Sequence, residues 1–155
     1  KDDTFLSSVR SKNSSTSACT VILSPLAGVL VLSYTYIPFH VDDDHSRTWV
    51  ISKTETGLRL KHDHRHKDGS EDAVTQYGGD TIYEGAPSRQ VFPVDQYSID
   101  MFEREGLEAS VVNIWAVEIN NATFAYELSR PNRHFRVEFD VTQPVDTPPA
   151  PWGFE

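Results

Sequence analysis

Residues 58–66 read LRLKHDHRH, and this stretch has the clearest two-residue period in the chain. The alternate positions carry leucine and then histidine: Leu58, Leu60, His62, His64 and His66. Charged side chains fill the positions between them: Arg59, Lys61, Asp63 and Arg65. Residues two apart on a β-strand project from the same face. The pattern therefore predicts a strand with one face that is apolar and then histidine-rich, and a charged opposite face.

Turn signals flank this strand on both sides. Residues 55–57 (Glu-Thr-Gly) separate it from an expected strand over residues 47–54, and the polar run over residues 67–72 separates it from an expected strand over residues 73–83. Gly78 and Gly79 interrupt that last segment, as expected of a bulge or a sharp bend. The region therefore predicts two consecutive antiparallel hairpins.

Further strands are expected along the rest of the chain, over residues 20–23, 29–41, 88–92, 110–119, 123–128 and 134–141. One helix is expected between Asp95, which can cap its first turn, and about Glu105, with Gly106 as the stop. Short turns join most of these strands, and closure of the sheet on itself accommodates about eight or nine strands best. The sequence thus predicts an all-β fold, an antiparallel closed β-barrel with one short helix.

The chain has 155 residues, a length that suits a single domain with one hydrophobic core. We expect an N-terminal arm over residues 1–18, the barrel over residues 19–141 and a Pro-rich tail over residues 142–155. Proline donates no backbone hydrogen bond. The tail is therefore expected to lie extended across the surface, with Trp152 or Phe154 as its anchor.

Charge and composition exclude several classes of partner. The formal net charge is −9, from 14 Lys and Arg against 23 Asp and Glu, which argues against binding to nucleic acid or to anionic lipid. Cys19 is the single cysteine, so no intrachain disulfide forms. The apolar stretch over residues 19–39 does not predict a membrane span, because Pro25, Gly28 and Pro38 interrupt it.

The histidines of the 58–66 strand are the main chemical signal. Alternate strand residues lie roughly 6–7 Å apart, so two neighbouring histidines can share a metal ion with a donor from the next strand. Glu71 is the first such donor in the sequence, with Asp72 and Gln76 as further candidates. The predicted metal ligands are His62, His64, His66 and Glu71, and imidazole with carboxylate suits zinc, iron, manganese or nickel.

Two other interpretations of this strand stay open. The histidines lie next to residues 67–69 (Lys-Asp-Gly), so they also fit a solvated hairpin tip that holds no metal. A catalytic role without metal is the other possibility, with His62 or Tyr77 as the proton carrier.

Aromatic residues of the strands are candidates for a ligand cavity, since barrels of about eight strands can enclose one small molecule. The predicted lining residues are Trp49, Trp115, Tyr34, Tyr36 and Tyr126. The same residues also suit a plain core. A separate site for an anion is conceivable at His134 with Arg133 and Arg136, although a solvated strand face explains these residues equally well. The leading functional prediction is a small-molecule-binding protein, and a filled barrel would favour a structural or interaction protein.

Residues 57–66, followed by residues 76–80 (Gln-Tyr-Gly-Gly-Asp), resemble small exported bacterial proteins with calycin-like, or lipocalin-like, β-barrels. This resemblance implies a barrel fold and a secreted or periplasmic location. It implies no particular reaction.

A shorter resemblance concerns the first metal motif of the cupins, carried by His64, His66, Glu71 and Gly78. It implies a metal-dependent oxygenase, lyase or isomerase, with His64, His66 and Glu71 as ligands. The second cupin motif has no counterpart in this chain.

Overall fold

A computed structural model describes residues 19–20, 34–83 and 85–154 of the chain. The expected arm over residues 1–18 lies outside these ranges. So do most of the expected strand over residues 20–23 and the beginning of the one over residues 29–41. The described residues confirm a mostly β fold with one α-helix.

Two antiparallel sheets make up the fold. The first has the order β1 to β5, from Cys19–Thr20, Tyr34–Val41, Asp44–Lys53, Leu58–His64 and Tyr77–Asp80. The second has the order β6 to β9, from Arg89–Pro93, Ile114–Ile119, Thr123–Arg130 and Arg133–Asp140. Helix α1 (Gln96–Arg104) and a short 3-10 helix, η1 (Glu108–Ser110), connect β6 to β7. Each strand pairs with its neighbour in sequence, so each sheet is a meander.

Two expected strands begin later in the structure than predicted. Strand β5 begins only at Tyr77, because the Asp72 side chain accepts from the Val74 amide in a local turn and Gln76 has a positive φ of 56°. Strand β7 begins at Ile114 rather than at Ser110, because η1 ends at Ser110 and a turn follows it. In both cases irregular backbone replaces the start of the expected strand. Val74, before β5, and Ser110 and Asn113, before β7, line the same pocket.

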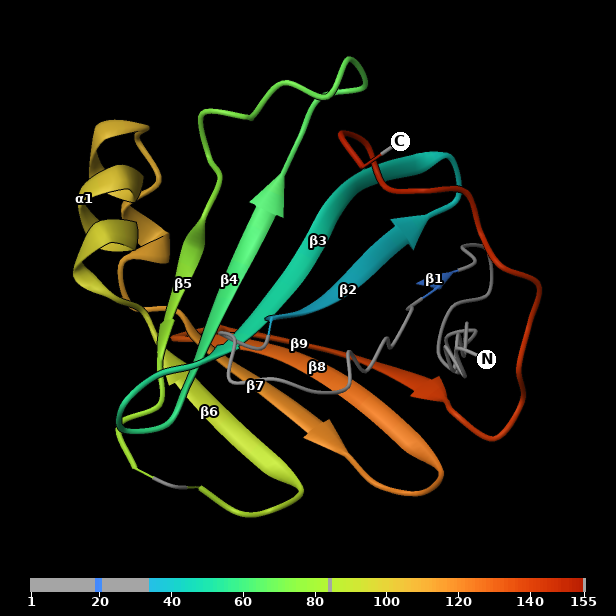
Figure 1. Ribbon diagram of the computed structural model, residues 1–155. Helices are drawn as coiled ribbons and strands as arrows, with labels where there is room; N and C mark the ends of the chain where they lie inside the picture. Colours follow the sequence, from blue (N-terminus) through green and yellow to red (C-terminus); the bar gives the residue numbers. More distant parts are fainter. Residues whose placement is uncertain (1–18, 21–33, 84, 155) are drawn as a thin grey trace.

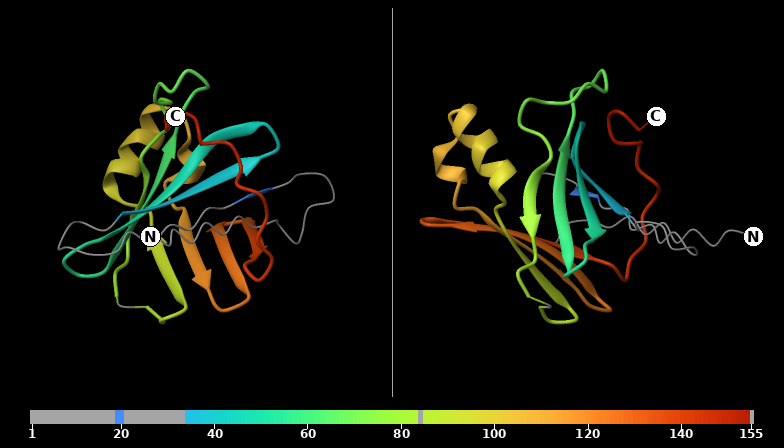
Figure 2. Two further views of the ribbon diagram at one scale, coloured as in Figure 1. Left: turned by 45° about the vertical axis from the view of Figure 1, so that its right-hand side comes forward. Right: turned by 60° about the vertical axis from the view of Figure 1, so that its left-hand side comes forward.

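The two sheets lie in two layers, and the strands of one cross those of the other (Figures 1 and 2). Aromatic rings fill the space between the layers. Trp49 of β3 stacks on Tyr126 of β8 across that space, with ring centroids 4.2 Å apart, and on Phe39 of its own sheet at 4.7 Å. Hydrogen-bonded strand pairs of the described residues form two sheets and not one continuous sheet. Closure into a barrel therefore stays a prediction.

The sheets meet where β5 passes β6 and the start of α1. The Gly78 carbonyl accepts from the Asp95 amide at 2.9 Å, and the Gly78 amide donates to the buried Ser98 hydroxyl at 2.8 Å. Gly79 lies directly against the backbone of Pro93, so that an added Cβ would overlap the Pro93 carbonyl. Gly78 and Gly79, where a bend was expected, are thus the place where the two sheets are in direct backbone contact. We call this contact of β5 with β6 and the start of α1 the seam between the sheets.

The expected helix is confirmed, with its signals in the predicted roles. Asp95 is the N-cap, and its carboxylate accepts from the Ser98 amide at 2.9 Å. Gly106 follows the last turn with a φ of 71°, a left-handed conformation that favours glycine. No helix in the described part of the chain is long and apolar enough to cross a membrane.

The Pro-rich end lies along the first sheet as far as Phe154 and contains no regular helix. The Trp152 amide donates to the His45 carbonyl at 3.1 Å. The Phe154 ring lies 5.6 Å from the Arg65 guanidinium and 5.8 Å from the Tyr36 ring. Both aromatic residues named as anchors therefore contact the sheet.

Candidate functional site

His62 is buried between the sheets and both of its ring nitrogens have partners. Nδ1 lies 2.9 Å from the Tyr77 carbonyl, and Nε2 lies 2.8 Å from the Tyr126 hydroxyl. A carbonyl only accepts, so this network assigns the proton to Nδ1 and makes Nε2 the acceptor of the Tyr126 proton. The imidazole also stacks on the Tyr77 ring, with centroids 4.4 Å apart.

Burial keeps this group of side chains neutral. Desolvation lowers the pKa of His62 to about 4, although the hydrogen bond to the Tyr77 carbonyl acts in the opposite direction. Burial likewise raises the pKa of Tyr126 well above its usual value, against a lowering hydrogen bond with Trp115. In this network both nitrogens of His62 have partners within the protein. A ligand would therefore have to replace one of these partners to exchange a proton with His62 directly.

We expect the stability of the protein to fall between pH 6.5 and pH 4. The His62 pKa is about 4 in the fold and about 6.5 in an unfolded chain, so the unfolded chain binds more protons in this interval. The contribution of His62 is complete above pH 6.5, and about 3 kcal/mol is lost once the pH is below 4. Urea unfolding at a series of pH values measures this loss.

His62→Gln is the matched variant, because glutamine keeps one donor and one acceptor but does not titrate. Its stability should depend less steeply on pH in this interval. Some dependence remains, since burial also lowers the pKa of His40 to about 4. An unchanged slope in the variant would show that protonation of His62 is not responsible.

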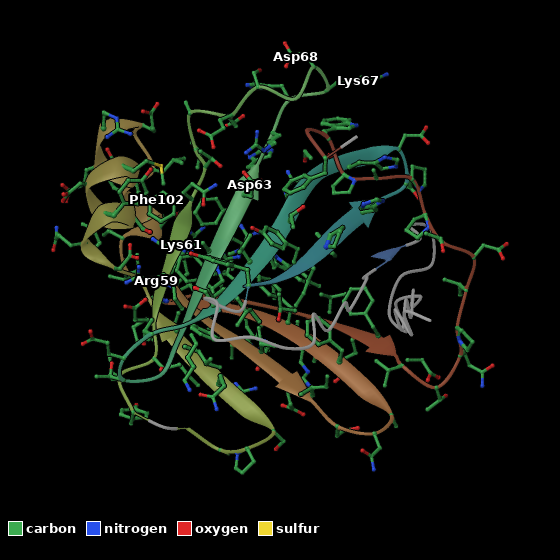
Figure 3. The ribbon with its side chains drawn as sticks, in the orientation of Figure 1. Arg59, Lys61, Asp63, Lys67, Asp68 and Phe102 are labelled. Carbon is green, nitrogen blue, oxygen red and sulfur yellow. The ribbon has the colours of Figure 1, made fainter. Side chains whose placement is uncertain are left out.

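The other metal candidates do not share the environment of His62. His64 Nδ1 lies 3.9 Å from one oxygen of Asp72, and His66 Nε2 lies 3.7 Å from the other. The Glu71 carboxylate lies 3.4 Å from the Arg65 guanidinium. The loop beyond these histidines carries Lys67 and Asp68 at its exposed tip (Figure 3).

These side chains do not fit a shared metal centre as they are placed. His62 faces the interior with both nitrogens bonded, whereas His66 is exposed at the hairpin end. Within residues 19–20, 34–83 and 85–154, no three His, Cys, Asp or Glu side chains are grouped as a metal would require. Metal binding by His64 or His66 stays a prediction of the sequence.

A pocket of about 240 Å³ is lined by Tyr77, by Tyr126 and by residues of the connection between β6 and β7. Its aromatic lining comes from β5, α1, β7 and β8, through Tyr77, Phe102, Trp115 and Tyr126. Val74, Leu107 and Leu128 add aliphatic surface, and Figure 3 shows Phe102 on the helix that borders it. The polar lining consists of Ser110, Asn113, Arg130 and Arg133. The arrangement suits a small molecule with an apolar body.

The five aromatic residues proposed for a ligand cavity separate into three places. Trp115 and Tyr126 line the pocket. Trp49 stacks on Tyr126 within the core and is not among the lining residues. Tyr34 and Tyr36 are exposed and their rings face each other, with centroids 6.2 Å apart. Only the first pair is therefore placed to touch a ligand in this pocket.

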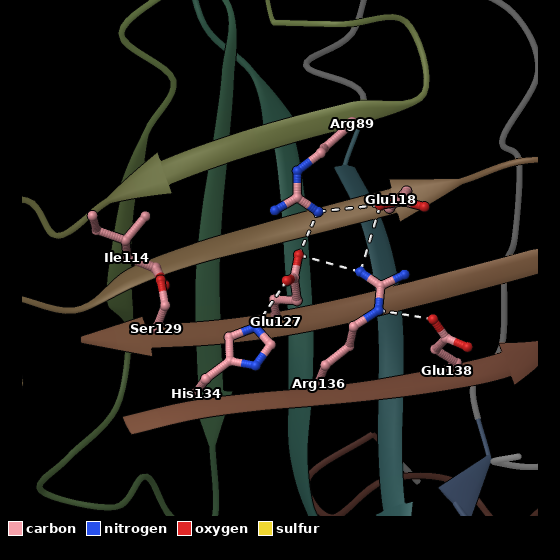
Figure 4. A network of polar contacts seen from close by, with 8 residues as sticks. All are labelled: Arg89, Ile114, Glu118, Glu127, Ser129, His134, Arg136 and Glu138. Carbon is pink, nitrogen blue, oxygen red and sulfur yellow. Dashed lines mark hydrogen bonds and ion pairs between the residues drawn. The ribbon is translucent and has the colours of Figure 1, made fainter. Parts of the chain in front are cut away.

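The outer face of the second sheet holds a dense set of charges (Figure 4). Glu127 lies at its centre, where it pairs with Arg89, with Arg136 at 3.2 Å and with His134 at 3.0 Å. Glu118 also contacts both arginines, at 3.1 and 3.5 Å. Because these charges satisfy one another, His134 and Arg136 belong to a structural network on this face. Arg133 lies apart from it, at the pocket.

Comparisons of the chain with protein-family models, with curated proteins and with solved structures gave no match. The resemblances to calycin-like barrels and to cupins therefore stay predictions.

Proposed function

We propose that this protein binds a small organic molecule in the pocket bordered by α1, η1, β7 and β8. The observation that carries this proposal is that seven apolar or aromatic side chains and four polar ones converge on one pocket, a combination typical of a ligand site. Its volume of about 240 Å³ is below the roughly 300–1,000 Å³ of sites for drug-sized ligands. A ligand with a single ring or a short chain suits this size.

The ligand is expected at the end of the fold and not at its centre. Trp49, Tyr126 and Phe39 stack in the middle of the space between the sheets and fill it. Side chains thus occupy the middle of this space, and the ligand is expected in the pocket beside η1 and the β8–β9 turn. Export to the periplasm or the medium is part of this proposal through the calycin-like resemblance, and cell fractionation tests it.

A neutral aromatic probe such as p-cresol tests the proposal directly. Among the indole N–H signals of Trp49, Trp115 and Trp152 in NMR spectra, that of Trp115 should shift most on titration. This result is expected because Trp115 alone of the three lines the pocket. The shift of the Trp115 signal must also saturate as the p-cresol concentration rises, as expected for binding at one site.

Leu107→Trp should abolish the shift, because the larger ring would occupy the pocket that Leu107 lines. Val112→Trp is the control, since Val112 is an exposed apolar residue of the same connection but does not line the pocket. Equal shifts at all three indoles, or none at any, would oppose the proposal and favour the structural or interaction protein.

A further inference from the structure

The arginines at the pocket differ from all others in the described chain. Six arginines each form an ion pair with an aspartate or glutamate: Arg47, Arg59, Arg65, Arg89, Arg104 and Arg136. Arg130 and Arg133, the remaining two of the described residues, pair with no carboxylate. Carboxylates outnumber cations in this protein, with a net charge of −9. Two guanidinium groups without an ion pair among the described residues, at one pocket of an acidic protein, therefore differ from the rest of its charged groups.

The turn between β8 and β9 places these two arginines together. Arg130 and Arg133 form the last paired position of the two strands, on either side of Pro131 and Asn132. Nη1 of Arg130 donates to the Ser110 hydroxyl at 3.0 Å, which holds its guanidinium at the pocket. A guanidinium offers several donors in one plane, so further N–H groups remain for another acceptor.

Asn113 provides a second polar observation in the same lining. Its side chain is 5% exposed, and its Oδ1 has no hydrogen-bond partner among the described residues. An unsatisfied buried acceptor costs about 1–3 kcal/mol in general, and such groups in native structures call for a partner. That oxygen is covered by the surrounding protein, so a donor group of a ligand would reach it only after the side chain turned toward the pocket.

We propose that the ligand is a small amphipathic carboxylate, with its ring or chain against Trp115 and Tyr126 and its carboxylate on Arg130 and Arg133. This inference rests on the proposed function and specifies the chemical class of its ligand. Guanidinium and carboxylate form charge-assisted hydrogen bonds, frequently two in parallel. The apolar lining accommodates the remainder of the molecule.

The test compares acids with their neutral amides. 3-Phenylpropionate, 4-hydroxyphenylacetate and hexanoate are titrated beside the corresponding amides, with the Trp115 indole signal as the readout. At least one acid should bind about tenfold or more tightly than its amide, the effect of a charge-assisted contact. Higher salt should weaken the binding of the acid and leave the binding of the amide unchanged.

Arg133→Gln should remove most of this preference, and its exposed side chain makes a folding defect unexpected. Arg130→Gln should act in the same direction. Both variants should keep their affinity for the amides within about twofold, since the apolar lining is intact. Arg104→Gln is the charge-matched control, because that arginine pairs with Glu105 and does not line the pocket.

The two proposals fail in distinguishable ways. Equal affinity for acids and amides, or no effect of either arginine variant, overturns the carboxylate assignment and leaves the binding function standing. If the acids fail to bind while the amides bind, the same conclusion holds. If neither acids, amides nor p-cresol bind, the proposed function is overturned as well.

Discussion

Gly79→Ala is expected to destabilise the fold severely. A Cβ at this position would overlap the carbonyl oxygen of Pro93, which belongs to the other sheet. The obstacle is backbone, so no rotation of a side chain can relieve it, and the seam between β5 and β6 would have to open. We expect a loss of at least about 3 kcal/mol of unfolding free energy. Many domains have only about 5–15 kcal/mol in total.

Gly106→Ala is the control that separates crowding from backbone strain. Gly106 has a φ of 71°, but a Cβ there would meet nothing within 4 Å. Alanine at a left-handed position costs about 1–2 kcal/mol without any collision. Urea unfolding curves of both variants give the comparison. Equal losses would contradict the close approach of Gly79 to Pro93.

The second large effect is expected at Trp49. Its ring lies between those of Phe39 and Tyr126, with centroids 4.7 and 4.2 Å away, and is 2% exposed. Trp49→Ala would remove the stacked contact with Tyr126 between the sheets and leave a cavity in the core. Truncations of this kind cost about 3–5 kcal/mol. Chemical unfolding followed by circular dichroism measures the loss.

Trp152→Ala is the matched truncation outside the core. Trp152 is half-buried on the Pro-rich tail, and its amide hydrogen bond to His45 belongs to the backbone and survives the change. We expect a loss less than half of that at Trp49, because less apolar surface is exposed to water. A larger loss at Trp152 would mean that the tail and not the central stack holds the layers together.

The sequence predicted the elements well where local signals determine them. Asp95 and Gly106 marked the helix ends because capping and positive φ depend on single residues. The period over residues 58–66 correctly placed Leu60 and His62 toward the interior. His64 still belongs to β4 and pairs with Arg47, but it is only partly buried, and His66 lies beyond the strand and is exposed. Their cover is lost because the ladder between β4 and β5 ends at the His62–Tyr77 pair.

The pocket was only partly predictable. Trp115 and Tyr126 were candidates because they are aromatic residues on strands, but the same argument also selected Trp49, Tyr34 and Tyr36. No local pattern distinguishes a ring that borders a gap from one that fills the core. Here the gap depends on where η1 ends and where the β8–β9 turn projects its arginines, which are properties of the assembled fold.

The anchored tail also bears on the kinetics of folding. The hydrogen bond from Trp152 to His45 joins segments separated by most of the described chain, whereas each sheet is built from neighbouring hairpins. Closing a longer loop costs more entropy, and contacts of high sequence separation slow folding. We expect the hairpins to form before the tail docks. Because the tail forms no strand of either sheet, it should also be the first segment to detach, exchanging its amide hydrogens while both sheets stay intact.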